Sequence, residues 1–411
     1  MQKLQVLGGI TAEEFLTEYW QKKPLLVKNA MPEINNLLEP DDIFELATEN
    51  GVSARLLTQH GTNHEQWQVK NSPLAEQDLK NVPELWTLLV QAVDHFSPDI
   101  ANLWQHFNFI PQWRRDDIMV SYAPKGGSVG KHYDQYDVFL VQGYGQRRWQ
   151  LGQYCTPDCE VLPDQPLRLL ADLDICFDEI LEPGDLLYVP PTLAHYGVAQ
   201  DDCLTFSFGF RMPNATQIMD ELTDQLLDKV AVQIPVADHS PRKLQAAGEV
   251  TTQDIELLKQ QLVELIQNSK YLDDAVLGLL SESKYADTLP ENERMSADEM
   301  LELLNEDATI QREPAVRLLY TYNQADQNQA KQNQANQSLL NQNELQLQFW
   351  ALGEPLIVTQ EFAPILKKLA DGAILQASDI ELTASNVEQL CQLYADSILL
   401  IYSIDEDWQD E

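Results

Sequence analysis

The chain has 411 residues, 44% of them hydrophobic, which is enough for two or three domains with buried cores. Asp and Glu number 65 against 27 Lys and Arg, so the formal net charge is −38. Such a charge repels phosphate backbones, which argues against direct nucleic-acid binding and favours basic partners.

The sequence carries no sign of secretion or of a membrane anchor. The N-terminal stretch MQKLQVLGGITAEEF lacks the apolar core and the cleavage site of a signal peptide. No uninterrupted apolar run reaches the length of about 18 residues that a membrane span needs. The five cysteines are odd in number and irregularly spaced, which argues against a disulfide framework. We therefore expect a cytoplasmic protein with no membrane partner.

The N-terminal part predicts short helices and one strand. Thr11 and Glu14 have the spacing of a capping box and precede an apolar-periodic segment, which predicts the start of a helix. Residues 24–27 (PLLV) predict a short strand. Residues 40–50 and 83–108 predict helices.

From residue 118 onward the hydrophobic period changes to two. Alternating segments are separated by turns that contain Gly and Pro, such as EPGD at 182–185. The segments with strand character are IMVSYA, DVFLVQ, RRWQLG, EILEPGDLLYVPP and CLTFSFGF. Several short strands at this spacing predict an antiparallel sandwich or barrel.

After Pro213 the composition shifts to helical periodicity. Residues 216–232 and 252–284 predict helices, and the apolar stripe of the first suits either an intramolecular core or a dimer seam. Residues 286–411 predict a small acidic module of helices and strands, with a Gln/Asn-rich loop at 323–347. The predicted domains are therefore 1–213, 214–285 and 286–411.

The stretch GKHYDQYDVFLVQG, residues 130–143, places ionisable residues in a segment with strand character. Residues two apart in a strand face the same side, so His132 and Asp134 are expected to offer a nitrogen and an oxygen to one point. A second His from a distant strand would complete the two-His, one-carboxylate triad of non-haem Fe(II) oxygenases. Of the seven His residues, only His195 follows a strand and turn, in GDLLYVPPTLAHYGV. The alternative is that His132 and His195 are ordinary buried histidines.

The neighbours of this motif suit the mouth of a pocket. By strand parity Asp137 falls on the side opposite Asp134, where we expect a loop or substrate-facing charge rather than a ligand. Tyr133, Gln135 and Tyr136 are expected at the same pocket mouth, within reach of a cationic side chain.

The next strand carries a candidate anion-binding residue. In QRRWQL, residues 146–151, Arg147 shares a face with Trp149, so it is expected to point inward. A buried guanidinium needs an anion, either the carboxylate of a co-substrate or the Asp or Glu of a buried ion pair. On the last predicted strand, Thr205 and Ser207 form a small polar face whose hydroxyls suit contact with a co-substrate or a satisfied core.

These motifs carry a family resemblance. The stretches HYDQYDVFLVQGYGQRRWQLG, LEPGDLLYVPPTLAHYG and SFGFR, with the earlier FLTEYWQKKPLLVKNA, resemble the JmjC-type 2-oxoglutarate oxygenases. Within that group the chain is most similar to the bacterial ribosomal oxygenases, which hydroxylate an arginine of a large-subunit ribosomal protein. The resemblance covers about residues 5–213 and is weaker but compatible beyond them. The Gln/Asn-rich insertion at 323–347 departs from the family pattern.

The resemblance implies a fold and a set of ligands. The fold is α+β, with a double-stranded β-helix (cupin or jelly-roll) catalytic domain of the JmjC type, a helical dimerisation segment and a C-terminal winged-helix-like module. His132, Asp134 and His195 are implied to bind Fe(II). Arg147 is implied to hold the distal carboxylate of 2-oxoglutarate, with O2 as the other co-substrate.

The implied activity is Fe(II)- and 2-oxoglutarate-dependent hydroxylation at C-3 of an arginine side chain in a large-subunit ribosomal protein, by a homodimer. The acidic chain suits such a basic substrate. Two alternatives stay open. A JmjC histidine hydroxylase or demethylase acting on another basic protein has the same metal site. A non-catalytic cupin scaffold needs neither Arg147 nor a complete triad.

Overall fold

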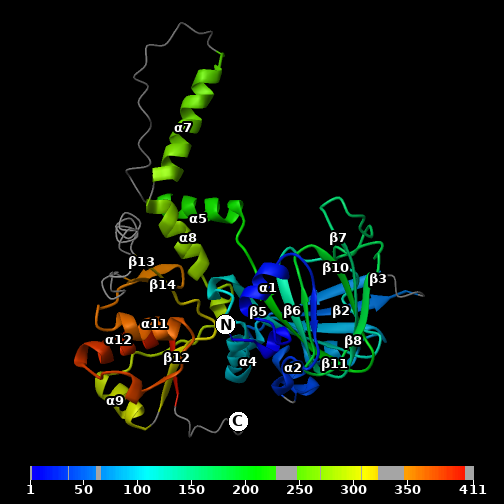
Figure 1. The fold of residues 1–411 in the computed structure, drawn as a ribbon, viewed down its shortest axis with the longest axis horizontal. Coiled ribbons are helices and arrows are strands. Elements are labelled where there is room, and N and C mark those ends of the chain that lie inside the picture. The colour runs from blue at the N-terminus through cyan, green and yellow to red at the C-terminus, as the bar shows by residue number, and fades with distance from the viewer. Residues whose placement is uncertain are drawn as a thin grey trace. The chain divides into compact units, whose positions relative to one another are not determined.

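The computed structural model shows two compact units (Figure 1). The first comprises residues 1–212 and 284–290, and the second residues 213–283 and 291–411. The structure describes residues 2–35, 37–61, 66–227, 248–268, 270–306, 308–322 and 347–402. The loop predicted at 323–347 lies outside these ranges apart from its last residue, as does the end of the helix predicted at 216–232.

The first unit is built on two antiparallel sheets, as the period-two pattern predicted. One has eight strands in the order β1-β9-β6-β11-β5-β4-β2-β3, and the other has three in the order β10-β7-β8. The strands are β1 (Leu25–Val27), β2 (Ala54–His60), β3 (Gln66–Asn71), β4 (Trp86–Val90), β5 (Arg115–Ala123), β6 (Asp137–Tyr144), β7 (Arg147–Tyr154), β8 (Phe177–Leu181), β9 (Leu186–Val189), β10 (Leu193–Ala199) and β11 (Cys203–Phe210). The strand order places β6 beside β9 and β11, which both come much later in the chain. Strand β6 directly follows the HxD motif, which is His132, Tyr133 and Asp134.

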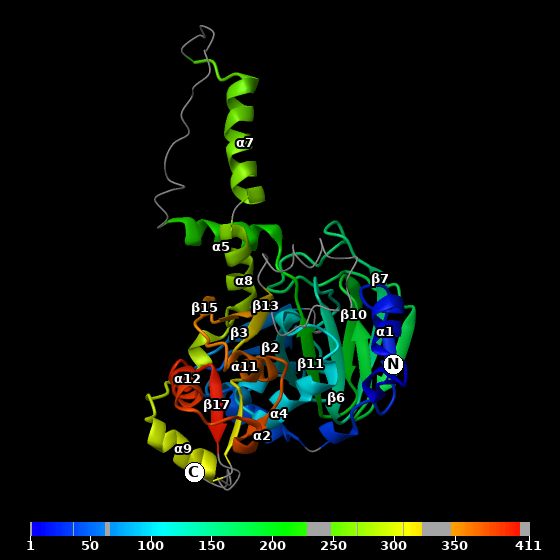
Figure 2. The same cartoon turned by 60° about the vertical axis from the view of Figure 1, so that its left-hand side comes forward.

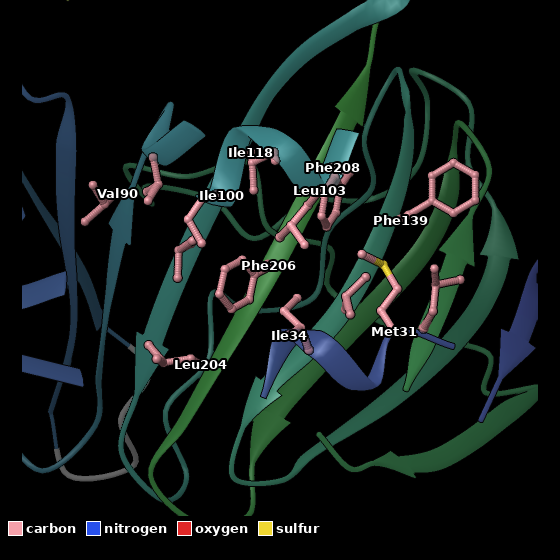
Figure 3. Packing of buried hydrophobic residues seen from close by; sticks show 14 of the residues in the cluster. Met31, Ile34, Val90, Ile100, Leu103, Ile118, Phe139, Leu204, Phe206 and Phe208 are labelled. Atoms are coloured by element: carbon pink, nitrogen blue, oxygen red, sulfur yellow. The ribbon is translucent and has the colours of Figure 1, made fainter. Parts of the chain in front are cut away.

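Strand alternation separates the core from the site. On β11 the side chains of Leu204, Phe206 and Phe208 are almost fully buried and form part of the main hydrophobic cluster (Figure 3). Thr205 and Ser207 alternate with them and line a cavity on the opposite face. A fully buried aromatic side chain contributes roughly 2–3 kcal/mol, so this strand anchors the cavity wall firmly.

Short helices flank the sheets of the first unit. They are α1 (Ala12–Glu18), α2 (Pro40–Leu46), α3 (Glu76–Lys80) and α4 (Pro98–Asn102). The predicted capping box is confirmed: the Glu14 backbone N–H donates to Thr11 Oγ1 at 3.1 Å, and the Thr11 N–H donates to Glu14 Oε2 at 2.7 Å. This exchange satisfies donors that the first turn of α1 leaves unpaired.

The prediction of a single helix over residues 83–108 is wrong. The first part of this segment is strand β4, whose five residues are all buried between β2 and β5. A short apolar run buried on both faces has no strand alternation, so periodicity does not distinguish it from a buried helix. Only the later part is helical, as short turns at Val93–His95 and Leu103–Phe107 around α4.

The second unit combines helices with two small sheets of orders β16-β12-β17 and β13-β14-β15. Its helices are α5 (Ala215–Leu227), α7 (Thr252–Asn268), α8 (Lys270–Ser281), α9 (Ala297–Asn305), α11 (Ala363–Ala370) and α12 (Ala384–Ala395). Its strands are β12 (Thr309–Arg312), β13 (Leu319–Tyr322), β14 (Leu347–Ala351), β15 (Glu354–Leu356), β16 (Leu375–Gln376) and β17 (Leu399–Tyr402).

Helices α5 and α8 pack against each other in this unit (Figure 2). A Cβ on Gly278 of α8 would lie 3.0 Å from Gln225 and 3.1 Å from Glu221, so glycine permits the close approach. Leu222 is buried, so the α5 stripe serves an intramolecular core at this position. No helix in the described ranges is long and apolar enough to cross a membrane.

Candidate metal centre and co-substrate cavity

Residues 63 positions apart meet through a single backbone bridge. The His132 N–H donates to the His195 carbonyl at 3.1 Å, and the His195 N–H donates to the His132 carbonyl at 2.8 Å. The Thr192 N–H also donates to the Asp134 carbonyl, at 2.7 Å. The prediction that His132 and Asp134 lie inside a regular strand is therefore wrong. They come just before β6, where these bonds hold them against β10.

The three predicted ligand side chains converge. One ligand atom from each of His132, Asp134 and His195 lies within 4.8 Å of the others. Asp134 Oδ2 is 3.6 Å from His195 Nε2 and 3.9 Å from His132 Nε2. Two imidazoles and one carboxylate around a common point match the donor set of a non-haem iron centre, which leaves positions open for other ligands.

The backbone selects the tautomer that a metal requires. Nδ1 of His132 lies 3.0 Å from the Gly130 carbonyl, and Nδ1 of His195 lies 3.0 Å from the Leu193 carbonyl. A carbonyl only accepts hydrogen bonds, so each Nδ1 carries a proton, and in the neutral ring the free lone pair is on Nε2. Burial, helped by His132, lowers the pKa of His195 to about 4, so its ring is neutral at physiological pH.

The centre opens into a cavity of about 400 Å³. Its walls include the three converging side chains, Arg147, Thr205 and Ser207, as the sequence predicted. They also include residues that the sequence did not single out: Arg55, Met119, Ser121, Arg168 and Arg211. Two of these, Met119 and Ser121, alternate along β5 and were readable in principle from its period of two.

Arg147 is buried in this cavity without a charge partner. Its side chain is among the buried polar groups, at 2% exposure. One guanidinium nitrogen donates to Ser121 Oγ at 3.3 Å, whereas Nε and the other terminal nitrogen have no hydrogen-bond partner. No ion pair joins Arg147 to a carboxylate in the described part of the chain. A buried cation with two free donors is a receptor for an anion.

The other predicted wall residues are more ordinary. Thr205 Oγ1 donates to Gln142 Oε1 at 2.9 Å, so its hydroxyl has only acceptor capacity left for a ligand. Ser207 lies along the same face of β11. Contact of either residue with a co-substrate stays a prediction. Arg148, the neighbour of Arg147 on β7, is exposed and pairs with Asp178.

The prediction that Asp137 is a loop or substrate-facing charge is wrong. This residue does not face the cavity or a substrate but is fully buried at the start of β6. Its carboxylate accepts hydrogen bonds from Tyr188 OH at 2.6 Å and Gln21 Nε2 at 2.9 Å, and it pairs with Arg114 at 3.3 Å. Burial raises the pKa of Asp137, against the lowering effect of these partners. It is a structural anchor between β6, β9 and the N-terminal segment.

Replacement of Asp137 by alanine is therefore expected to destabilise the first unit by about 3–5 kcal/mol, because the partly buried Arg114 loses its carboxylate partner and the buried Tyr188 hydroxyl loses its acceptor. Urea unfolding followed by tryptophan fluorescence measures this. The exposed neighbour Gln135 is the matched control, and Gln135→Ala should change stability by less than about 0.5 kcal/mol. Equal unfolding midpoints for the two variants would contradict the anchoring role.

A second buried carboxylate, Asp117 on β5, has a different consequence. Its Oδ2 accepts from the Ala92 N–H at 2.9 Å and from Tyr285 OH at 3.1 Å. Burial, with repulsion from Asp116, raises the pKa of Asp117 from 3.8 to about 6. The folded state then binds a proton that the unfolded state has lost, so stability falls as pH rises from about 4 to about 6.

The variant Asp117→Asn removes this titration and can keep both hydrogen bonds through one amide oxygen. Near pH 4 the free energy of unfolding of the variant is expected to equal that of the parent or to lie below it. Above pH 7 it is expected to be larger than that of the parent by on the order of 2 kcal/mol. Thermal melts across this pH range provide the measurement. A difference that does not grow with pH would show that Asp117 is already ionised at low pH in the folded protein.

Comparison with known proteins assigns the chain to a family. Residues 102–218 match the family model of the JmjC domain, and residues 254–399 match that of the ROXA-like winged helix. A protein of Haemophilus influenzae named "Probable ribosomal oxygenase" is 40% identical over 418 positions, which cover 97% of this chain and 96% of that protein. The chain belongs to the ribosomal oxygenase family.

Two further relatives agree with this assignment. The "Ribosomal protein uL16 3-hydroxylase" of Escherichia coli is 32% identical over 307 positions, covering 74% of this chain and 81% of that protein. The structure of YcfD, a ribosomal oxygenase from Escherichia coli in complex with cobalt and 2-oxoglutarate, matches with a TM-score of 0.77 and 27% identity, over 98% of this chain and 99% of that one. The predicted fold class, a JmjC cupin domain with a C-terminal winged helix, is confirmed, and the chain is an oxygenase rather than a scaffold.

Proposed function

We propose that this family member is an Fe(II)- and 2-oxoglutarate-dependent hydroxylase of C-3 of an arginine side chain in a large-subunit ribosomal protein, acting in the cytoplasm. One observation carries the proposal. Two imidazoles and a carboxylate converge in the wall of a cavity that also contains a buried arginine with two unpaired guanidinium nitrogens. This pairing of a facial triad with an anion receptor suits a metal and a dicarboxylate together.

The residues present fit both groups. His132, Asp134 and His195 would hold Fe(II) through two Nε2 atoms and a carboxylate oxygen, and Arg147 would hold the distal carboxylate of 2-oxoglutarate. When bound, iron and 2-oxoglutarate supply oxygen activation, in which one atom of O2 reaches the substrate and the other appears in succinate. The chain keeps the His195 imidazole neutral, orients the co-substrate and encloses it between β6, β7 and β11.

The substrate assignment rests on charge and on the relatives. A chain of net charge −38 attracts a basic protein over a long range. The Escherichia coli relative is named for its action on ribosomal protein uL16, at position 3 of a residue. Tyr133 and Tyr136 line the cavity beside the metal ligands, where an aliphatic stem and a cationic head would both find contacts.

The test is direct. Purified protein is incubated with Fe(II), 2-oxoglutarate, O2 and ribosomal protein uL16, and the substrate is analysed by tandem mass spectrometry. We expect one added oxygen atom on an arginine, with one succinate formed per oxygen added. Oxygen added to a histidine, or loss of a methyl group from a lysine, would support the alternative activities instead. Absence of 2-oxoglutarate turnover with uL16 and other basic proteins, in a preparation that holds iron, would refute the proposal.

We also propose that residues 214–285 form a dimerisation segment. Along α7, Ile255, Leu258 and Leu262 lie at intervals of three and four, so they share one helix face. Their side chains are 45%, 64% and 48% exposed. An apolar stripe left exposed on a helix is a common protein-interaction surface, and a second copy of the chain offers the same stripe in a two-fold arrangement.

Substitution Leu258→Glu is therefore expected to convert a dimer to a monomer, because it places a charge at the centre of an apolar seam. Size-exclusion chromatography with light scattering reports the mass. The control Gln253→Glu adds the same charge on the opposite face of α7 and should remain dimeric. A dimer that persists in Leu258→Glu would move the interface away from α7.

A further inference from the structure

A second cavity, of about 570 Å³, lies in the first unit away from the metal centre. It is walled by helices α2 and α3 and floored by strands β4 and β5. Its lining shares no residue with the cavity around His132. On β5, Ser121 faces the metal cavity and the next residue, Tyr122, faces the second cavity, so the two cavities lie on opposite faces of this strand.

Three aromatic rings dominate the second cavity. Phe44 and Tyr122 meet edge to face at 4.8 Å between centroids, and Trp86 lies 5.3 Å from Tyr122 and 6.1 Å from Phe44. Burial and the nearby Asp202 carboxylate raise the pKa of Tyr122, so its phenol is neutral. Trp86 and Tyr122 are 9% and 7% exposed and Phe44 is half-buried, so the three rings offer a limited aromatic surface to the cavity, and such a surface attracts a cation.

Carboxylates complete the cavity. Glu45 and Glu76 line it, one from each flanking helix. Lys80 also lines it but is already paired with Glu76 on the same helix. Glu45 has no basic partner among the residues that the structure describes. The site therefore combines an aromatic floor with an uncompensated negative charge, which disfavours an anion and suits a cation with an apolar stem.

We propose that this aromatic cavity binds an arginine side chain of the basic protein substrate, as an anchor separate from the residue that is modified. This inference rests on the proposed function for the identity of the partner. Arginine suits the cavity better than lysine, because a planar guanidinium stacks on aromatic rings and engages a carboxylate with two donors. The anchor lies on the other face of β5 from the metal centre, so it engages a segment of the partner distant from the target residue.

Binding is tested without turnover. The protein is labelled with 5-fluorotryptophan, and the Trp86 resonance is identified by its absence from Trp86→Phe. The probes are Nα-acetyl-arginine amide and its neutral isostere Nα-acetyl-citrulline amide. We expect the arginine probe to shift the Trp86 resonance saturably and the citrulline probe to bind at least about tenfold more weakly. Equal shifts with both probes, or no shift with either, would overturn the proposal.

A matched pair of variants locates the charge. Glu45→Gln is expected to weaken binding of the arginine probe by about fivefold to tenfold. Glu49→Gln removes an exposed carboxylate just beyond α2 and outside the cavity lining, and should bind as the parent does. Unchanged binding in Glu45→Gln would remove the carboxylate from the site and refute recognition by charge.

The link to the substrate has its own readout. Glu45→Gln should raise the KM for full-length uL16 severalfold while leaving kcat and the KM for a short peptide around the target arginine unchanged. An unchanged KM for the full-length protein would overturn the anchoring role. Failure of the proposed function looks different, since hydroxylation of both peptide and protein would then be absent while the Trp86 resonance still responds to the arginine probe.

Discussion

Replacement of His132 by alanine is expected to lower both metal affinity and hydroxylation by on the order of a thousandfold, because the facial triad loses one of its two imidazoles. The fold should survive. The hydrogen bonds that join residue 132 to His195 are made by backbone atoms, which alanine retains. Metal content by mass spectrometry, succinate formation and circular dichroism melts test the three parts of this prediction separately.

The matched control is His106→Ala. His106 is a partly exposed histidine that pairs with Glu33 at 2.6 Å, outside the metal cavity. This variant should retain metal and activity, so any general effect of losing a histidine is accounted for. Full turnover in His132→Ala would show that the converging side chains are not the iron ligands, and the centre would have to be sought elsewhere.

Replacement of Arg147 by alanine is expected to raise the KM for 2-oxoglutarate about a hundredfold, with a smaller effect on kcat at saturation. The reason is that a desolvated carboxylate would lose a charged partner, at a cost of about 2–5 kcal/mol. The unliganded protein should be little destabilised, because two Arg147 nitrogens are unsatisfied before any anion binds. The thermal stabilisation that 2-oxoglutarate confers on the parent should disappear in the variant.

Arg148→Ala provides the control for this prediction. The two arginines are adjacent on β7, but Arg148 is exposed on the opposite face and pairs with Asp178. Its loss should leave the 2-oxoglutarate KM within about twofold, since an exposed ion pair contributes at most about 1 kcal/mol. A KM that rises equally in both variants would indicate general electrostatic attraction of the dianion rather than a specific carboxylate contact.

The sequence by itself determined the parts of the molecule that depend on local pattern. The period of two from residue 118 predicted antiparallel strands, and alternation within QRRWQL placed Arg147 on the inward face with Trp149. The spacing of His132 and Asp134, with a stiff PP turn before His195, was enough to name the side chains that converge. The strand predictions follow from the fixed two-residue repeat of a strand. The HxD spacing gave the correct side chains for another reason, because the motif lies before β6 and a backbone bridge to His195 holds it in place.

Only the tertiary structure decided what depends on partners distant along the chain. The segment that forms β4 has the pattern of a helix in the sequence, and only its pairing with β2 and β5 along its two edges makes it a central strand. Asp137 is predicted as a substrate contact from the sequence, but in the structure Tyr188 and Gln21 bind its carboxylate. The aromatic cavity likewise exists only because α2, α3, β4 and β5 meet there. Burial and hydrogen-bond partners are non-local, so a carboxylate that looks free in the sequence becomes an anchor or a binding group only once the chain has folded.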